Sequence, residues 1–599
     1  MSIDPAPSVT PETDHPHATP PPSWPRVELQ GGDLAVVAAY HRLSMLDPER
    51  HGALPGRLER LRQPVPFRRY LGAATTTLPR PDGDLDNEPK TPAALNLLGQ
   101  VLGDALGVVG WRRHAEAAFG LRATPSAGNL HPLEAYLAVP GLGAGESPSD
   151  AELFHYSAFD HALERRRRLP VEVWDSLRAA APEARAVVVL TAIYWRTAWK
   201  YGERAFRLAH LDAGHGLAAL DAAAAVVGLK ARWVDAASAD LEILLGIDGD
   251  SGPEAEDAVA MVALEPADAD VPASGWWPEA DVLDALVGQA CSGVPSRISE
   301  RHRIWPGGVA AARATRRERE VADGPREVPS ATGPASTVFS RDVLRRRRSR
   351  AVYEGRALTQ AELATIASHL VGDLPAGLWG ATDLVTLLFV HRVEGVEPGL
   401  YALFGGPEAG IDAEIADLRA VLRAELEWRD VELEPLDTAS GAGRFRLVRL
   451  TGGDSQRAAS HLAGGQTAAG DGGFCALFLG KTAALARDGA WAYRRLHWLA
   501  GARAHRLYLA AEDLNLGATG LGGFYDDQLA NLLGLDVAGA EREARPWEPL
   551  YLAAVGRRAA TDPPLEPPYD HRGSGAEPVP ASQGGYRTLK PQARPSPPL

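Results

Sequence analysis

The chain has 599 residues, 45% of them hydrophobic and 7% aromatic, and a formal net charge of −15 at pH 7. So acidic a chain is not expected to bind nucleic acid or an anionic membrane, because phosphate binding needs a basic surface. Two distant cysteines, Cys291 and Cys475, exclude a disulfide framework and a cysteine-built metal site, and no metal is expected. Without a membrane-length apolar run or a signal-peptide core, the sequence predicts a soluble cytoplasmic protein.

Both ends of the chain are rich in proline and hold little that could pack. Residues 1–30 and residues 561–599 are therefore predicted to be disordered tails. The length between them suits about four average domains or two large ones.

A first folded unit is expected over residues 31–265. Alternating runs of helical spacing and short apolar segments indicate a mixture of helices and strands. The unit begins near 34–40; helices are predicted at 93–106 and through 217–227, ending at Gly228, and strands at 134–139, 187–190 and 259–264.

Residues 266–336 turn to proline, alanine, aspartate, arginine and glycine, which predicts a connecting segment with one helix around 280–289. A second unit is expected over residues 337–560. Its predicted elements are strands at 384–390, 474–479 and 550–555 and a helix near 505–514.

The two units are weak repeats of each other. The segment LEILLGID at 241–248 aligns with LANLLGLD at 529–536, and each copy follows an apolar helix that ends in glycine. A period this long indicates a domain duplication rather than a solenoid.

The first motif that points to chemistry is a loop in the first unit, Pro125-Ser126-Ala127-Gly128-Asn129. Proline fixes φ, and Gly and Asn tolerate left-handed backbone, so such a loop lets amides and one hydroxyl approach a flat ligand closely. The alternative is an ordinary turn between a helix and a strand.

Arginines gather at the start of the second unit, where Arg345 to Arg348 precede Ser349 and Arg350. Guanidinium groups and a hydroxyl suit a phosphate dianion, although four arginines are more often a solvated basic run. Which arginine would reach the phosphate stays open. A second basic pair, Arg557-Arg558, ends the last predicted strand.

A glycine-rich segment, LGATGLGGF, spans residues 516–524. We interpret it as a helix-to-strand loop whose glycines allow close backbone approach to a ligand, with a plain turn as the alternative. The contacts would come from Gly520, Leu521, Gly522 and Gly523.

Candidate catalytic residues lie in Trp199-Lys200-Tyr201-Gly202-Glu203-Arg204, which is followed by Ala213-Gly214-His215. A lysine becomes a useful base when burial or a cation such as Arg204 lowers its pKa. Alternatively, Lys200 and Tyr201 lie on a surface helix.

Two further features receive ordinary interpretations. Arg165–Arg168 is expected to be a solvated turn, and His131 is expected to serve packing or hydrogen bonding rather than catalysis.

These motifs together resemble those of the nitroreductase superfamily, specifically the SagB-type (McbC-like) azoline dehydrogenases. The resemblance implies an α+β fold: a mostly antiparallel central sheet flanked by helices, in two tandem copies that form an intrachain pseudo-dimer. It implies FMN bound by residues 125–129, Arg204, Arg347, Arg348, Ser349, 520–523, Arg557 and Arg558. Lys200 and Tyr201 match the family's catalytic pair, and residues 393–401 match its VxGLxPGxY hairpin.

The motifs are unevenly distributed between the two units. The first unit has the Pro125 loop but ends without arginine, whereas the second has the arginines and glycines but no such loop near 373–381. We therefore expect one complete composite FMN site and one degenerate site. A weaker phosphate site around His41, Arg42 and Ser44 remains an alternative, so one or two FMN per chain stay possible.

The resemblance implies an FMN-dependent oxidoreductase that converts thiazoline or oxazoline rings of a ribosomally synthesised peptide (a RiPP precursor) to thiazoles or oxazoles. Its partners would be that peptide and a cyclodehydratase. The alternatives are an NAD(P)H-dependent nitro or quinone reductase, and a flavin-free peptide-binding scaffold. The sequence leaves open the peptide, the azoline type, the electron acceptor and further oligomerisation.

Overall fold

The computed structural model describes most of the chain between residues 32 and 588. The predicted tail at 1–30 lies outside the described residues. These are 32–51, 63–81, 92–114, 117–142, 151–248, 252, 254–270, 275–319, 338–372, 374–378, 380–406, 408–433, 445–535, 545–559, 565–569, 576–578 and 586–588.

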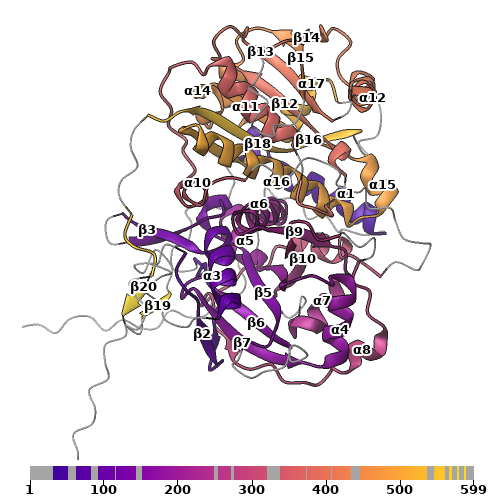
Figure 1. Cartoon of the computed structure of the whole chain (residues 1–599). Coiled ribbons are helices and arrows are strands. Elements are labelled where there is room, and N and C mark those ends of the chain that lie inside the picture. Colours follow the sequence, from indigo (N-terminus) through magenta and orange to yellow (C-terminus); the bar gives the residue numbers. More distant parts are fainter. Residues whose placement is uncertain are drawn as a thin grey trace, which may run out of the picture.

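The first unit is built on a seven-stranded sheet in which every neighbouring pair is antiparallel (Figure 1). The predicted strands at 134–139, 187–190 and 259–264 are confirmed. The strand order is β2 (Thr75–Thr77), β7 (Ala162–Leu169), β6 (Ala151–Ser157), β5 (Leu133–Pro140), β8 (Ala186–Ala192), β10 (Asp257–Pro266) and β9 (Leu229–Val234).

The second unit repeats this sheet, again with antiparallel pairs throughout. The predicted strands at 384–390, 474–479 and 550–555 are confirmed, and residues 393–401 connect a hairpin as expected. The order is β14 (Arg429–Val431), β15 (Phe445–Gly452), β13 (Gly399–Gly405), β12 (Leu384–Val390), β16 (Phe474–Lys481), β18 (Trp547–Arg557) and β17 (Leu516–Leu521).

Helices cover both faces of each sheet, so the central strands are apolar on both sides. In β8, Val188 and Leu190 join one core, while Val187 and Val189 join another. Helices α3 (Ala93–Ala105) and α6 (Ala205–Val226) supply the first core; α4 (Val171–Ala180), α7 (Ser238–Leu245) and α8 (Ala280–Asp284) supply the second.

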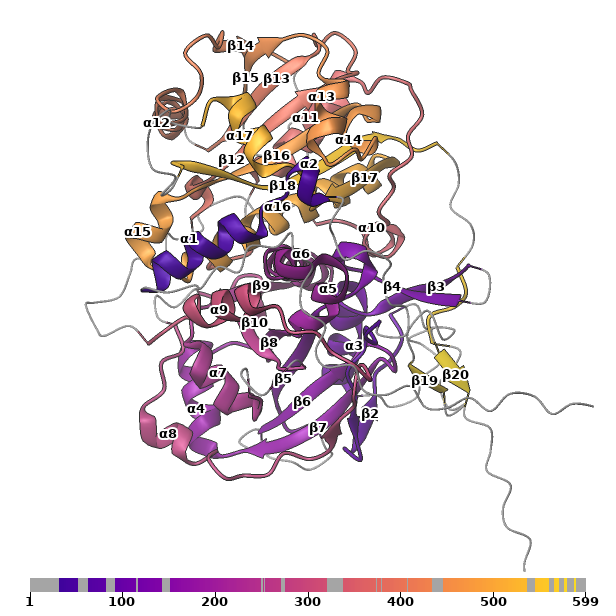
Figure 2. The same cartoon turned by 180° about the vertical axis from the view of Figure 1, so that it is seen from behind.

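The second sheet is arranged in the same way (Figure 2). Helices α11 (Gln360–Val371) and α16 (Ala492–Asp513) pack on the face toward the first unit, and α12 (Glu408–Arg419), α13 (Gln456–Leu462) and α17 (Asp526–Leu533) on the opposite face. Shorter helices are α2 (Pro48–His51), α5 (Tyr194–Tyr201), α10 (Arg341–Arg346), α14 (Ala468–Asp471) and α15 (Ala483–Asp488).

The two units meet where α6 crosses α16, in the middle of the molecule (Figure 1). The crossing is made by glycines: a Cβ on Gly501 would lie 3.0 Å from the Cα of Gly214. Trp498 Nε1 donates to His210 Nδ1 across the same contact at 3.0 Å. A single hydrophobic core therefore runs through both units.

The structure confirms the duplication. Helices α6 and α16 each have 22 residues, and both α7 and α17 end at a left-handed glycine, Gly246 and Gly534. The α+β class, with two tandem copies of one helix-flanked antiparallel sheet, is therefore as expected.

Part of the predicted connecting segment packs onto the first unit. Its helix α8 is shorter than predicted, and a further helix, α9 (Pro306–Ala314), packs against the N-terminal helix α1 (Asp33–Ser44). Helix α1 also contacts the second unit through Tyr493.

The interpretation of Arg165–Arg168 as a solvated turn is wrong, because these residues lie in β7. Arg166 and Arg167 are buried. The Arg166 guanidinium lies over the Tyr70 ring at 3.5 Å, and Arg167 donates to the carbonyls of Ile243 and Leu244. The interpretation of 516–524 as a loop is also wrong over Leu516–Leu521, which forms β17 beside β18.

The predicted C-terminal disorder does not extend to the described residues Leu565–Tyr569. This segment, called here the C-terminal strap, lies along β3 (Val108–His114), which is paired with β4 (Ala117–Arg122). Trp111 N donates to Glu566 O at 3.0 Å, and Glu566 N donates back to Trp111 O at 2.9 Å. Tyr569 is buried and stacks on His161. Short pairs also form between β1 (Tyr70–Leu71) and β11 (Val294–Pro295), and between β19 (Ala576–Pro578) and β20 (Tyr586–Thr588).

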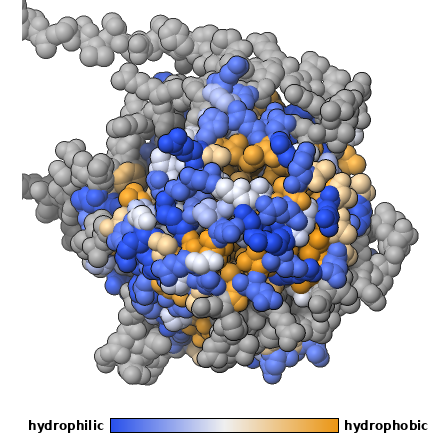
Figure 3. All heavy atoms as spheres, turned by 90° about the horizontal axis from the view of Figure 1, so that it is seen from above, coloured by the Kyte–Doolittle hydropathy of each residue, from blue (hydrophilic) through white to orange (hydrophobic). Residues whose placement is uncertain are grey.

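No helix in the described part of the chain has the length and apolarity needed to cross a bilayer. Seen from above, the described surface is largely hydrophilic with small apolar patches between (Figure 3).

Candidate active site at the interface of the two units

The Pro125 loop connects β4 to β5 and has the strained backbone that its residues predict. Gly128, Asn129 and His131 all have positive φ, between 47° and 65°. Asn129 tolerates this conformation because its short polar side chain bonds locally; here its Nδ2 donates to Gly120 O at 3.0 Å. The Asn129 Oδ1 lies 2.9 Å from His131 Nε2, so His131 has the hydrogen-bonding role expected for it.

Lys200 and Tyr201 end helix α5 directly beside this loop. A Cβ at Gly128 would lie 3.0 Å from the Tyr201 hydroxyl oxygen and 3.2 Å from Lys200 Cδ, so only glycine fits without displacing them. Gly128 is exposed, and both side chains are half-buried. The predicted catalytic pair and the predicted flavin loop therefore lie together at a place that solvent can reach.

Burial shifts the acidity of both groups. It lowers the pKa of Lys200, which favours the neutral amine, and raises the pKa of Tyr201 to about 12, which keeps the phenol protonated at neutral pH. Arg204 does not contribute to the lowered pKa of Lys200. Its guanidinium instead pairs with Asp526 at 2.8 Å and donates to Gly522 O at 2.7 Å.

Arg347 brings the second unit to the loop. Its Nε donates to Ala123 O at 2.7 Å and its Nη2 to Arg122 O at 3.2 Å, just before the loop begins. The side chain is buried, and Nη1 has no acceptor among the described residues. A buried guanidinium with one unsatisfied nitrogen leaves room for an acceptor from a ligand.

The arginine segment and the glycine-rich segment lie side by side. Arg350 N donates to Ala518 O at 2.8 Å. Tyr508 of α16 joins the two segments, because its hydroxyl accepts from Gly520 N at 2.6 Å and lies 2.9 Å from Ser349 Oγ. Gly520, Gly522 and Gly523 remain partly exposed.

The remaining arginines divide into two groups. Arg350 and Arg558 both bind the buried carboxylate of Glu512, at 2.6 and 2.9 Å, and Arg346 lies 3.9 Å from it. Arg346 lies closer to Asp342, at 3.0 Å, so the two guanidinium groups of Arg350 and Arg558 on one carboxylate are what leaves excess positive charge here.

The other predicted phosphate ligands are held elsewhere. Arg557 pairs with Glu362 at 2.9 Å and is not brought to the cluster. Arg348 donates to the carbonyls of Arg345 and Arg347, and Arg345 contacts Asp104. Within 345–350, Arg347 contacts the residues before the Pro125 loop and Arg350 contacts the glycine-rich segment; which arginine would bind the phosphate stays a prediction.

The corresponding place on the other side of the pseudo-dimer is filled. Trp233, the fifth residue of β9, stands where β17 has Gly520, and its ring stacks on Trp491 with centroids 6.3 Å apart. The segment of the second unit that corresponds in position to the Pro125 loop reaches β9, because Trp233 N donates to Ala376 O at 2.7 Å. Arg487-Asp488 precedes α16 as Lys200-Tyr201 precedes α6. The Arg487 guanidinium forms ion pairs with Asp383 and Asp488.

The alternative phosphate site near α1 is engaged in contacts between the units. His41 Nδ1 lies 2.9 Å from the Tyr493 hydroxyl and its Nε2 lies 3.4 Å from Glu548. Within the first unit, the backbone carbonyl of Ser44 accepts from Arg204. The His41 ring is thus the group here that contacts the second unit.

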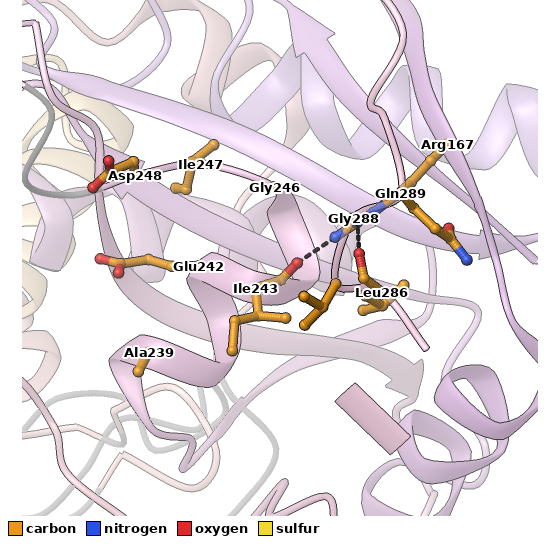
Figure 4. Close-up of a pocket in the computed structure, with 11 residues that line it drawn as sticks. Arg167, Ala239, Glu242, Ile243, Gly246, Ile247, Asp248, Leu286, Gly288 and Gln289 are labelled. Atoms are coloured by element: carbon orange, nitrogen blue, oxygen red, sulfur yellow. Dashed lines mark hydrogen bonds between the residues drawn. The ribbon is translucent and has the colours of Figure 1, made fainter. Parts of the chain in front are cut away.

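A separate cavity of about 380 Å³ lies on the opposite face of the first sheet, between α7 and the segment after α8 (Figure 4). Arg167 lines it and donates to the last carbonyls of α7. No residue of the predicted site lines this cavity, so it plays no part in the composite site.

The chain matches the sequence model described as "Nitroreductase family" over residues 93–264 and 425–557, just over half of its length. The chain belongs to the nitroreductase family. A protein named as a nitroreductase from Methanocaldococcus jannaschii is 32% identical over 131 residues, which are 21% of this chain and 60% of that protein.

A solved structure shows the same fold. A nitroreductase-type protein of Anabaena variabilis, 23% identical, covers 87% of this chain and 99% of its own with a TM-score of 0.63. A chain of the E. coli microcin synthetase McbBCD complex, solved with truncated pro-MccB17 bound, is 17% identical and covers 40% of this chain and 93% of its own, with a TM-score of 0.24. The fold and the family are thus established independently of the motifs.

Sequence patterns do not single out four residues that the structure places in this site: Asp212, Tyr508, Glu512 and Tyr551. The hydroxyl of Tyr551 lies 3.2 Å from His215 Nε2 and would overlap a Cβ at Gly520. All four lie on buried parts of α6, α16 or β18 and belong to no motif. The only local signal is that Asp212 directly precedes the Ala-Gly-His segment.

Proposed function

We propose that the chain is an FMN-dependent dehydrogenase that oxidises thiazoline or oxazoline rings of a ribosomally synthesised peptide to azoles. The observation that carries the proposal is the position of Lys200 and Tyr201. They lie against the exposed Gly128 of the Pro125 loop, at the interface that also gathers Arg347 and the glycine-rich segment. The azoline substrate rests on the resemblance of the Lys-Tyr segment to the SagB branch.

The residues present fit FMN. Arg350, which directly follows the exposed residue Ser349, shares the single carboxylate of Glu512 with Arg558, and the excess positive charge suits a phosphate. The unsatisfied Nη1 of Arg347 and the partly exposed backbone of 126–128 and 520–523 suit a flat ring rich in acceptors. FMN bound there would accept the hydride that the azoline ring loses.

Lys200 would take the proton that leaves the ring together with the hydride. A base must be neutral to do this, and burial shifts Lys200 in that direction. Among the described residues, no carboxylate pairs with its ammonium group; the contact it makes is with the Tyr201 ring, 5.2 Å from the nitrogen. Tyr201 stays protonated and would orient the amine or the substrate by donating a hydrogen bond.

One FMN per chain is expected, because Trp233 and Trp491 fill the corresponding place in the other half of the pseudo-dimer. The first measurement is therefore the flavin released per chain from the purified protein. Two FMN per chain would contradict the asymmetry. A protein that stays free of flavin after FMN is added would support the scaffold alternative.

Lys200→Ala is the decisive variant. It should retain FMN and lose about 10²–10⁴-fold in the rate at which an azoline peptide reduces the flavin under anaerobic conditions. Lys481→Ala, a surface lysine paired with Asp417, is the matched control and should react like the unaltered protein. If NADPH reduces the flavin rapidly and Lys200→Ala changes nothing, the protein is a reductase instead.

A further inference from the structure

Asp212 holds the Pro125 loop from helix α6. Ser126 Oγ donates to Asp212 Oδ2 at 2.6 Å, and Ala127 N donates to Oδ1 at 3.2 Å. The aspartate is only 4% exposed, so these bonds form out of contact with water. Both carboxylate oxygens are therefore committed to two successive residues of the loop that contacts the proposed cofactor.

While Asp212 is ionised, the single hydrogen of the Ser126 hydroxyl is donated to its carboxylate and cannot be donated to a ligand. A serine hydroxyl has one hydrogen to donate and two lone pairs that accept. Here the hydrogen goes to Asp212, and the oxygen accepts from His131 N at 2.9 Å. Once Asp212 is protonated, its own O–H can donate to the serine oxygen, and the serine hydrogen is free to turn toward the site.

The surroundings of Asp212 favour this exchange of protons near neutral pH. Burial raises the pKa of Asp212 to about 7, against the two hydrogen bonds, which favour the carboxylate. Tyr201 from α5 and Tyr551 from β18 face it, and burial raises the pKa of both, so they stay neutral. Below its pKa Asp212 is protonated and releases Ser126; above it, the carboxylate holds Ser126.

The histidines nearby do not titrate in this range. Burial and Arg347 lower the pKa of His215, one turn further along α6, to about 3, and burial lowers that of His505 on α16 as well. Arg347 stays charged and acts on His215 and Tyr551. Lys200, whose pKa burial also lowers, packs against Gly128, where its Cδ would lie 3.2 Å from a Cβ.

We propose that Asp212 is a positioning residue whose protonation decides whether the Ser126 hydroxyl is held by α6 or donates into the cofactor site. The proposal rests on the proposed function for the identity of the ligand, but not for the behaviour of the loop. Hydrogen bonds to a flavin ring tune its electronic properties, so the loop would couple proton uptake to the readiness of the bound cofactor to accept electrons.

The first test follows the loop itself and needs no flavin. Hydrogen exchange of the peptide containing Ala127, corrected for intrinsic exchange, should rise about tenfold as pH falls through neutrality, because the amide loses a charged acceptor. Asp212→Asn keeps an acceptor but cannot titrate, so its exchange should be independent of pH. Asp221→Asn, a buried aspartate further along α6, should behave like the unaltered protein.

The second test uses the flavin-loaded protein. The visible spectrum of bound FMN should shift with a midpoint near neutral pH, and the shift should vanish in both Asp212→Asn and Ser126→Ala. Exchange and spectra that are the same in Asp212→Asn and the unaltered protein at every pH overturn the inference. A protein that binds no flavin but shows the pH-dependent loop refutes the proposed function and leaves the role of Asp212 standing.

Discussion

Replacing Gly214 by alanine tests the contact on which the composite site depends. A Cβ at this position would overlap the carbonyl oxygen of Trp498 and lie 2.8 Å from that residue's Cα and carbonyl carbon. These are backbone atoms of α16, which cannot rotate away as a side chain can. The two helices would have to separate by about 1 Å to restore ordinary van der Waals contact.

The cost follows from the packing. Overfilling a well-packed core costs about 1–3 kcal/mol, while alanine gains up to ~1 kcal/mol over glycine in a helix. Gly216→Ala is the matched control on the same helix, since its Cβ would meet only the ends of Leu133 and Leu190, at 3.1 and 3.4 Å. Because the gain from alanine is common to both variants, we expect Gly214→Ala to be less stable than Gly216→Ala by about 1–3 kcal/mol.

Thermal unfolding of the two variants side by side measures this difference. For domains of this size, 1 kcal/mol corresponds to about 2–4 °C in Tm, so the two melting temperatures should differ by roughly 2–12 °C. Gly214 lies between Asp212 and His215, so the variant should also release flavin faster. A Gly214→Ala protein that melts at or above the Gly216→Ala protein would refute the close crossing of α6 and α16.

Two more substitutions probe the ends of the site. Glu512→Gln removes the carboxylate that pairs with Arg350 and Arg558, so the phosphate of FMN should be bound more tightly by on the order of 1 kcal/mol. The readout is the rate at which flavin dissociates on dilution, which should fall. A faster dissociation contradicts the proposal. Tyr569→Ala should free the C-terminal strap from β3: hydrogen exchange at Trp111 should accelerate with the second sheet unaffected, whereas unchanged exchange would mean that Tyr569 does not hold the strap.

Local signals in the sequence predicted part of the secondary structure. Short apolar runs identified β5, β8 and β12, and helical spacing identified α3 and the C-terminal part of α6, because a buried strand is apolar on both faces and a helix repeats every 3.6 residues. The left-handed Gly128 and Asn129 were likewise readable from residue type. The structure brings the Lys-Tyr pair and Arg347 to the Pro125 loop, whereas other partners hold Arg348 and Arg557.

The errors arose where distant partners override a local pattern. Four consecutive arginines predict a solvent-exposed segment. In β7, however, Arg166 packs on the ring of Tyr70, and Arg167 donates hydrogen bonds to carbonyls at the end of α7. Glycines at 516–521 indicate a loop, yet the edge of β18 pairs with them as a strand. The proline-rich sequence of the C-terminal strap indicates disorder, yet β3 binds it.

The sequence alone determined the fold class, the duplication and the set of residue types in the candidate site, because these depend on periodicity, spacing and short motifs. Only the tertiary structure decided their partners: Asp212 for Ser126, Glu512 for Arg350 and Arg558, and Trp491 for Trp233. These contacts join residues far apart in the chain and exist only once the chain has folded. Burial there sets the acidity of Lys200 and Asp212, and burial is a property of the packed molecule rather than of any segment.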